Sequence, residues 1–267
     1  FGDGASGFRY LHDEISGGLF GVSHLKCRTA YTGDSVEVDS VDYGFVSGVV
    51  DLSSIDAANA ADANSETYYD QVGSNDMPFA STSPFYDKSE NEFPNTAGAA
   101  YRPSTVTGSL GSLTTSDAFT SIHVIKHNTG TYATQEWFMS FEGTTTNRFM
   151  WQGGALRFLI SGGSNLIVDV TGQNNSNLKL LVCTYDGSLN STGMEIYQDD
   201  MVTPLSGTKS GSGGSSTSYF GSMSLSGRAS NLVGRYNGFI YETHIFNKVL
   251  SETERETAKE ILEQYYT

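Results

Sequence analysis

Apolar and polar residues alternate in short runs along the second half of the chain. From about residue 115 onward these runs are rich in β-branched and aromatic residues, and clusters of glycine, serine and asparagine separate them. The runs occupy residues 118–127, 136–142, 148–152, 155–161, 165–170, 178–185, 193–199, 219–223 and 238–246. Short strands at roughly 8–12-residue spacing are typical of an antiparallel sandwich. The pattern therefore predicts an all-β fold, with further strands at 36–38 and 43–50 and a loop at 206–218.

A different period appears only near the end of the chain. Ser251 begins an S-x-x-E sequence with Glu254, which is the pattern of a helix capping box. Apolar residues then recur at i, i+3, i+4 and i+7, namely Ala258, Ile261, Leu262 and Tyr265. We expect an amphipathic helix that packs on the edge of the sandwich and has a structural role. Short helices are also expected at 19–26 and, after an Asp51 cap, within 51–65.

The first 18 residues contain five glycines and show no clear period. We interpret 1–18 as an N-terminal arm or linker that gains order by packing on a partner chain. Residues 19–267 are then expected to form a single domain, which is a usual length for a β-sandwich.

Composition supports a folded, turn-rich chain. Glycine supplies 30 of the 267 residues, aromatic residues make up 12% and charged residues only 17%. So many aromatic residues are enough to build a core, which excludes a disordered chain. No apolar run approaches the ~18 residues needed to cross a membrane, and no signal peptide is expected at the N-terminus. The two cysteines, Cys27 and Cys183, exclude a disulfide framework and are expected to be free thiols.

The net charge of −15 bears on the partners of the chain. An acidic surface repels phosphate backbones and anionic headgroups, so nucleic acid and membrane insertion are disfavoured. The same charge either serves solubility alone or provides oxygen ligands for Ca²⁺.

Three stretches of sequence resemble a known family. Residues 18–55 (GLFGVSHLKCRTAYTGDSVEVDSVDYGFVSGVVDLSSI) resemble the entry segment of laminin-G-like, concanavalin A-like modules. Residues 67–76 (TYYDQVGSND) resemble a turn of the same group, with matches at Tyr69, Asp70, Gln71, Gly73, Asn75 and Asp76 and departures at Val72 and Ser74. Residues 180–204 together with 237–265 resemble its closing strands and last helix. These stretches cover about half of the chain, in the order that the family has.

The resemblance implies a concanavalin A-like antiparallel β-sandwich (jelly roll) with a short C-terminal α-helix. Such modules occur in bacteriophage tail and virion proteins and in the catalytic domain of the arabinofuranosidase B family. The fold hosts lectins, hydrolases and purely structural modules, so it does not by itself decide between them.

The carboxylates do not show the spacing of a glycosidase. Such an enzyme needs two carboxyl groups about 5–10 Å apart. Glu136 and Glu142 share one face of an expected strand, but six residues at ~3.3 Å separate them by roughly 20 Å. Asp199 and Asp200 are adjacent and would point to opposite faces of a strand or lie in the turn after it. No stretch matches the catalytic carboxylates of the arabinofuranosidase family, so catalytic residues are not expected.

Metal sites have one candidate. Asp70, Asn75 and Asp76 gather oxygen ligands around a glycine turn, which suits Ca²⁺. The alternative is a tight turn whose side chains bond its own backbone. His123 and His127 lie ~13 Å apart along a strand and are expected to be structural. Asp186 and Gly187 are expected to form a hairpin turn.

Glycan contacts are expected from aromatic residues in loops. Tyr132, Tyr219 and Tyr236 border glycine-rich turns, where their rings would be exposed for stacking on sugars. Trp137 and Trp151 alternate with other apolar residues and are expected to be buried.

Together these features lead to one interpretation and two alternatives. We expect a non-enzymatic virion module of a bacteriophage, of the tail-fibre, head-fibre or capsid-decoration type, with a lectin-like face for host-surface glycans. Its partners would be these glycans and other virion proteins, and the chain would form a homo-oligomer that faces outward on the virion. The first alternative is a glycoside hydrolase or its carbohydrate-binding accessory domain. The second is a purely architectural virion protein.

Overall fold

Strands dominate the structure, which is a computed structural model. It describes residues 11–23, 34–38, 41–46, 49–50, 65–68, 70, 72–73, 75, 77–78, 94–95, 113–127, 135–142, 146–161, 164–213, 222–225 and 236–266. The elements are α1 (Leu11–Glu14), β1 (Gly18–Ser23), β2 (Asp34–Val38), β3 (Val41–Val46), β4 (Val49–Val50), β5 (Ser65–Tyr68), β6 (Met77–Pro78), β7 (Pro94–Asn95), β8 (Phe119–His127), β9 (Gln135–Glu142), β10 (Thr146–Gln152), β11 (Ala155–Ser161), β12 (Asn165–Thr171), β13 (Lys179–Tyr185), the 3-10 helix η1 (Ser191–Gly193), β14 (Met194–Gln198), β15 (Thr208–Ser210), β16 (Ser222–Leu225), β17 (Gly238–Phe246) and α4 (Glu252–Tyr266).

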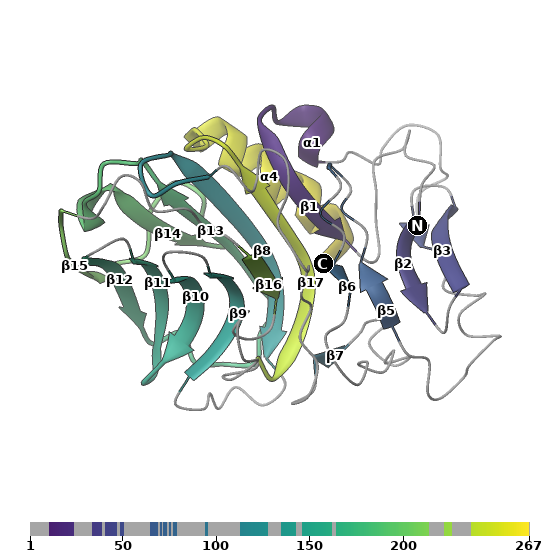
Figure 1. Cartoon of the computed structure of the whole chain (residues 1–267), viewed down its shortest axis with the longest axis horizontal. Coiled ribbons are helices and arrows are strands. Elements are labelled where there is room, and N and C mark those ends of the chain that lie inside the picture. The colour runs from purple at the N-terminus through teal and green to yellow at the C-terminus, as the bar shows by residue number, and fades with distance from the viewer. Residues whose placement is uncertain are drawn as a thin grey trace.

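Two antiparallel sheets form the sandwich (Figure 1). The first has the order β1-β17-β8-β13-β14, and β7 pairs with the free end of β17. The second has the order β15-β12-β11-β10-β9-β16. A smaller sheet, β4-β3-β2-β5-β6, is built from the first part of the chain. This arrangement confirms the all-β sandwich with a C-terminal helix that the sequence predicts.

Aromatic rings fill the space between the two large sheets. Phe149 and Phe158 stack with centroids 4.5 Å apart, and Phe119 meets Phe158 edge-on. Trp151 and Tyr185 are fully buried in the same core. Burying each such side chain contributes about 1.5–3 kcal/mol, so this interior is the main source of stability.

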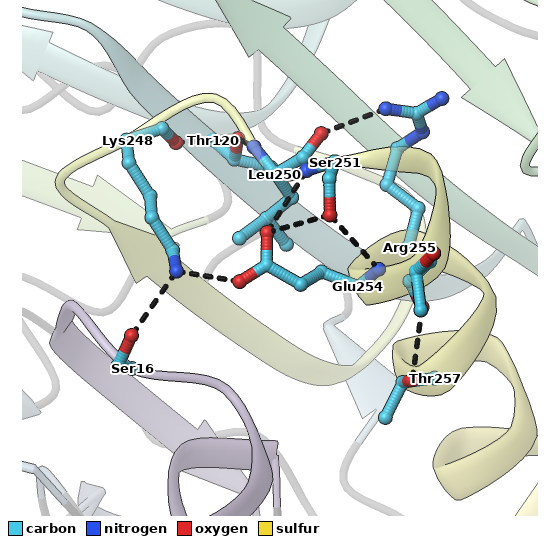
Figure 2. A network of polar contacts seen from close by, with 9 residues as sticks. Ser16, Thr120, Lys248, Leu250, Ser251, Glu254, Arg255 and Thr257 are labelled. Carbon is cyan, nitrogen blue, oxygen red and sulfur yellow. Dashed lines mark hydrogen bonds and ion pairs between the residues drawn. The ribbon is translucent and has the colours of Figure 1, made fainter.

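A second apolar layer covers the outer face of the first sheet. Ile122, Val124 and Val182 on that face pack with Ala258, Ile261 and Leu262 of α4. Figure 2 shows how α4 is attached at its start. The Ser251 hydroxyl accepts from the Glu254 N–H, and the Glu254 carboxylate accepts from the Ser251 N–H, which confirms the predicted capping box.

Hydrogen bonds fix the chain between β17 and α4 to the sheet. The Thr120 hydroxyl donates to the Lys248 carbonyl and accepts from the Leu250 N–H (Figure 2). The Arg255 guanidinium donates to the carbonyls of Met201 and Leu250, and it lies 4.0 Å above the Tyr197 ring. These bonds hold α4 in one register on the sandwich.

The N-terminal segment differs from the predicted arm. Leu11 and Ile15 are buried at 1% and 2% exposure in the layer under α4, so residues 11–18 belong to the domain. Residues 1–10 of the predicted arm lie outside the described residues. The helix predicted at 19–26 is also wrong, because residues 18–23 form β1 along β17. Gly18 and Gly21 disfavour a helix, and pairing with β17 satisfies the backbone of this segment.

The later strands follow the prediction closely. Eight of the nine predicted runs match the strands β8 to β14 and β17, and the run 219–223 overlaps β16 at residues 222–223. The short strand β15 lies inside the predicted loop 206–218, where it pairs with β12. The helix predicted within 51–65 falls on residues of which only Ser65 is described, and Ser65 begins β5.

Candidate functional site: a polar row on the outer face of the second sheet

Tyr236 does not contribute to an exposed glycan site, contrary to the prediction. Its ring is 1% exposed and stacks on Trp151 at a centroid distance of 5.7 Å. The adjacent segment enters β17, and this directs the ring into the sandwich instead of toward solvent. Trp151 and Trp137 are buried, as predicted.

The other two predicted glycan contacts, Tyr132 and Tyr219, lie outside the described residues. Within the described part of the chain, every aromatic side chain with an assigned exposure is buried, at 8% or less. None of these side chains therefore offers a stacking platform for a sugar.

The predicted calcium ligands Asp70 and Asn75 come together in a buried turn. One carboxylate oxygen of Asp70 accepts from the N–H groups of Val72 and Gly21, and the other accepts from the backbone N–H and side-chain amide of Asn75. These contacts are those of a side-chain-bonded turn that also ties the segment to β1. Asp76 lies outside the described residues.

The two histidines of β8, His123 and His127, are buried in the interior of the sandwich. His123 is fully buried, and its ring nitrogens contact the hydroxyls of Ser121 and Thr243 at 3.1 and 3.2 Å. Burial, and next the nearby His244, lower the pKa of His123 to about 3. His127 bonds Glu136 at 2.9 Å, and Glu136 also accepts from the Asn237 N–H. Glu136 is thus a buried partner of a histidine rather than one half of an exposed acid pair.

A row of polar side chains crosses the outer face of the second sheet. Along β11 and β12 the core residues Phe158 and Val168 point inward, so their neighbours Arg157 and Asp169 point outward. Arg157 lies directly opposite Asp169 in the strand register, and Gln152 at the end of β10 lies opposite Gln135 of β9. The row therefore comprises Gln135, Gln152, Arg157 and Asp169, and it spans four neighbouring strands.

The centre of this polar row is a fixed ion pair. Arg157 donates from Nε and Nη2 to the two oxygens of Asp169, both at 2.6 Å. Its Nη1 donates to the Gln152 side-chain carbonyl at 2.5 Å. The hydrogen bond to Asp169 raises the pKa of Arg157, so the guanidinium stays charged. The bidentate pair and the bond to Gln152 together hold the guanidinium, the carboxylate and the amide in one orientation on the sheet.

The polar row is half open to solvent, whereas its apolar neighbours are covered. The side chains of Arg157 and Asp169 are 22% and 27% exposed. Trp137, Met150 and Leu159 share the same outer face by register and alternation, but their exposure is only 0–5%. A ligand can therefore reach the planar polar groups and not the apolar strip beside them.

Chemically, the polar row suits the binding of hydroxyl groups. The guanidinium has two N–H groups beyond the three used within the row, and the carboxylate and amide oxygens retain free lone pairs. The pair is neutral as a whole, so it offers donors and acceptors side by side without a net charge. Adjacent hydroxyls of a sugar need that combination.

Sequence reasoning did not select these four residues. The signal was present, because Arg157 and Asp169 are the charged residues within two largely apolar runs, 155–161 and 165–170. Their cross-strand pairing depends on the register of β11 and β12, which the sequence alone does not fix.

The described ranges contain neither a metal-binding cluster nor a membrane-spanning helix. No group of three or more histidine, cysteine, aspartate or glutamate side chains there has the arrangement of a metal site. No described helix is long and apolar enough to cross a membrane. Cys183 is buried, and this burial raises the pKa of its thiol, so it is not reactive.

Solved structures of low sequence identity share this fold. A GH54 α-L-arabinofuranosidase soaked with a cyclic sulfate inhibitor matches with a TM-score of 0.62 and 14% identity, over 94% of this chain and 64% of that chain. A mutant GH54 enzyme soaked with 4-nitrophenyl α-L-arabinofuranoside gives a TM-score of 0.64 over the same shares. The binding domain of botulinum neurotoxin serotype D/C matches with a TM-score of 0.61 and 10% identity, over 94% of this chain and 53% of that chain.

These matches define the class of the fold. The chain is an antiparallel β-sandwich of the kind found in a carbohydrate-active enzyme and in a toxin binding domain, and it spans less than two thirds of their length. The resemblance to arabinofuranosidases is thereby confirmed at the level of the fold. No protein-family model matches the chain, and no curated protein sequence matches it.

Proposed function

We propose that this chain is a non-enzymatic glycan-binding module that uses the polar row of Gln135, Gln152, Arg157 and Asp169. The observation that carries the proposal is the ion pair Arg157–Asp169, which is half open and bound to Gln152 on a sheet face. The sandwich fold, which this chain shares with a carbohydrate-active enzyme, also supports a glycan-binding function.

The charge of the chain indicates which class of glycan it would bind. The chain carries a net charge of −15, which repels acidic polysaccharides at long range. Because Asp169 neutralises Arg157 locally, the row has no excess positive charge to offset that repulsion. The proposed ligand is therefore a neutral polysaccharide with adjacent hydroxyl groups.

Affinity at a single site should be low. Sugar hydroxyls compete with water, so each hydrogen bond gives a small net gain. Without an exposed aromatic ring in the row, one site should bind near the millimolar range, about −4 kcal/mol. Useful binding then requires several copies, and we propose a homo-oligomer for this reason.

The biological setting is part of the proposal. The sequence stretches 18–55, 67–76 and 180–204 with 237–265 resemble laminin-G-like, concanavalin A-like modules, which occur in bacteriophage tail and virion proteins. We propose an outward-facing adhesion role on the virion toward host-surface glycans, next to other virion proteins.

Glycoside hydrolysis is the second candidate, and the arabinofuranosidase likeness is what favours it. Within the polar row the only carboxylate is Asp169, and both of its oxygens are engaged by Arg157. A hydrolase needs a second carboxyl group about 5–10 Å away. Release of reducing sugar from a bound polysaccharide by the pure protein would establish this alternative.

A matched pair of substitutions tests the binding site. Asp169→Asn breaks the ion pair of the row, and Glu195→Gln breaks the Lys209–Glu195 pair, which has a similar exposure of 25% and 32%. On a neutral-glycan array, a multimeric form of the Asp169→Asn variant should lose at least about tenfold in apparent affinity, and the Glu195→Gln variant should bind like the original chain. Equal binding by both variants would show that the row is not the site.

A further inference from the structure

Three titratable side chains form a continuous hydrogen-bonded line between β17 and α1. Glu242 and His244 are two residues apart on β17, and Nε2 of His244 lies 2.7 Å from Oε2 of Glu242. On its other side, Nδ1 of His244 lies 3.1 Å from Nε2 of His12 on α1. The His12 ring also stacks on Phe246 at a centroid distance of 4.7 Å.

Among the described residues, mainly apolar side chains flank the line. On the neighbouring strand β8 the residues that share its face are Ile122 and Val124, and α4 contributes the apolar side chains of Ala258, Ile261 and Leu262 to the same layer. On the β1 side, Gly21 lies opposite His244 and its N–H donates to the Asp70 carboxylate.

Two further described acids of α1 and one histidine of β8 lie near the line. Asp13 and Glu14 of α1 are exposed. His123 lies on the interior face of the sheet, and the proximity of His244 is one cause of its lowered pKa. Within the line, His244 is 0% and Glu242 3% exposed, and the carboxylate of Glu242 contacts His244 directly.

The contact between the two histidines depends on the number of protons they carry. With both rings neutral, His12 Nε2–H donates to His244 Nδ1, and His244 Nε2–H donates to Glu242. One extra proton preserves the contact, because one of the facing nitrogens still accepts. A second extra proton places an N–H group on both facing nitrogens, and the two cationic rings then repel each other.

We propose that His12, His244 and Glu242 form an acid-sensitive latch that holds the segment 11–16 on the domain and releases it when both histidines are protonated. Glu242 is essential to this behaviour, because its carboxylate accepts the Nε2–H of His244 and so leaves Nδ1 to face His12.

Release would be local to the N-terminal segment. It withdraws Leu11 and Ile15 from the layer under α4 and breaks the hydrogen bond from Lys248 to the Ser16 hydroxyl. It can stop at Gly17, whose carbonyl accepts from the Asn247 N–H where β1 begins. The pKa of the buried His123 is about 3, so acid weakens the interior through the stability of the whole fold and not through a local break at this ring.

Hydrogen exchange of the whole chain tests the latch. Exchange of the amides in 11–16 is compared with that in β8 and β13 at about pH 7.5 and about pH 5, after correction for the intrinsic rates. If opening is coupled to the uptake of one proton, its equilibrium constant rises by up to about tenfold for each pH unit below the usual titration range of histidine. We therefore expect segment 11–16 to lose at least about tenfold in protection, also in a His123→Gln background, which removes this acid-dependent loss of global stability from β8 and β13.

Two variants separate a latch from a simple packing contact. In His12→Gln the introduced amide donates at neutral pH and accepts in acid, so the contact persists. In Glu242→Gln, a His244 that carries two protons no longer has a carboxylate partner, so we expect the contact with His12 to persist in acid. Both variants should be more protected than the original chain at the acidic pH, and the control Asp13→Asn, on the same helix, should behave like the original.

The outcome that overturns the latch is equally definite. A variant that only damages packing loses protection at both pH values. Lower protection of both variants in acid, or unchanged protection of segment 11–16 in the original chain between the two pH values, would refute the proposal. This result is independent of glycan binding, since the latch and the polar row lie on different sheets.

Discussion

The ring of Tyr236 lies nearly parallel to the indole of Trp151, at an angle of 19° and a centroid distance of 5.7 Å. Phe138 and His127 meet the same tyrosine ring edge-on. Tyr236 precedes β17, whereas Trp151 lies on β10 of the opposite sheet. The stack therefore joins the two layers of the sandwich across its interior.

Removing this ring should destabilise the fold. Replacing a large buried aromatic side chain by alanine typically costs about 3–5 kcal/mol, because the cavity does not fully collapse. We expect Tyr236→Ala to reduce the free energy of unfolding by about this amount in urea titrations. Val202→Ala, at a side chain that is 50% exposed, should change it by less than about 0.5 kcal/mol. If both variants unfolded at the same urea concentration, Tyr236 would not be a core residue.

Docking of α4 leads to a second prediction. Ile261 and Leu262 are 1% and 2% exposed against the outer face of the first sheet. Their replacement by alanine should each cost about 2–5 kcal/mol. Glu256→Ala on the exposed side of the same helix should stay within about 0.5 kcal/mol of the original. Small effects at both buried positions, measured by thermal or urea unfolding, would mean that the helix does not stabilise the sandwich.

The sequence predicted the strands of the second half well, because each has its own alternation and a polar turn at each end. The capping box of Ser251 and Glu254 was equally local, since both partners lie within one helical turn. The segment 18–23 was different. Leu19, Phe20 and Val22 suit either a helix or a strand, and only pairing with β17, more than 200 residues away, makes it a strand.

The candidate site was harder to predict for the same physical reason. Tyr236 borders a glycine-rich turn, and its sequence position does not reveal whether the ring turns outward or into the core. The polar row requires Arg157 and Asp169 to lie opposite each other, which is a property of strand register. Carbohydrate was predicted as the ligand class from the family resemblance. Composition and charge did not indicate it, because acidic surfaces have many uses.

His123 should make the stability of the fold depend on pH. Its pKa is lowered from 6.5 to about 3 by burial and by His244, so the folded state binds fewer protons than the unfolded state between these values. The contribution is therefore fully present above about pH 6.5 and is lost as the pH falls toward 3, by up to about 1.4 kcal/mol per pH unit. His123→Gln removes this group and should reduce the slope of unfolding free energy against pH by about one proton. An unchanged slope in urea titrations between about pH 6 and about pH 4 would show that His123 is not the titrating group.

Two glycines in the turn after β15 offer the last prediction. Gly211 and Gly213 both have positive φ, at 98° and 76°, where a side chain is strained. A Cβ at Gly213 would meet open space, but one at Gly211 would overlap the backbone oxygen of Asn165. Gly213→Ala should therefore cost only the backbone strain, about 1–2 kcal/mol. Gly211→Ala should cost about 1–3 kcal/mol more, because β12 must shift to admit the methyl group. Urea unfolding of the two variants measures the difference, and equal costs would mean that the approach of Gly211 to β12 is not close.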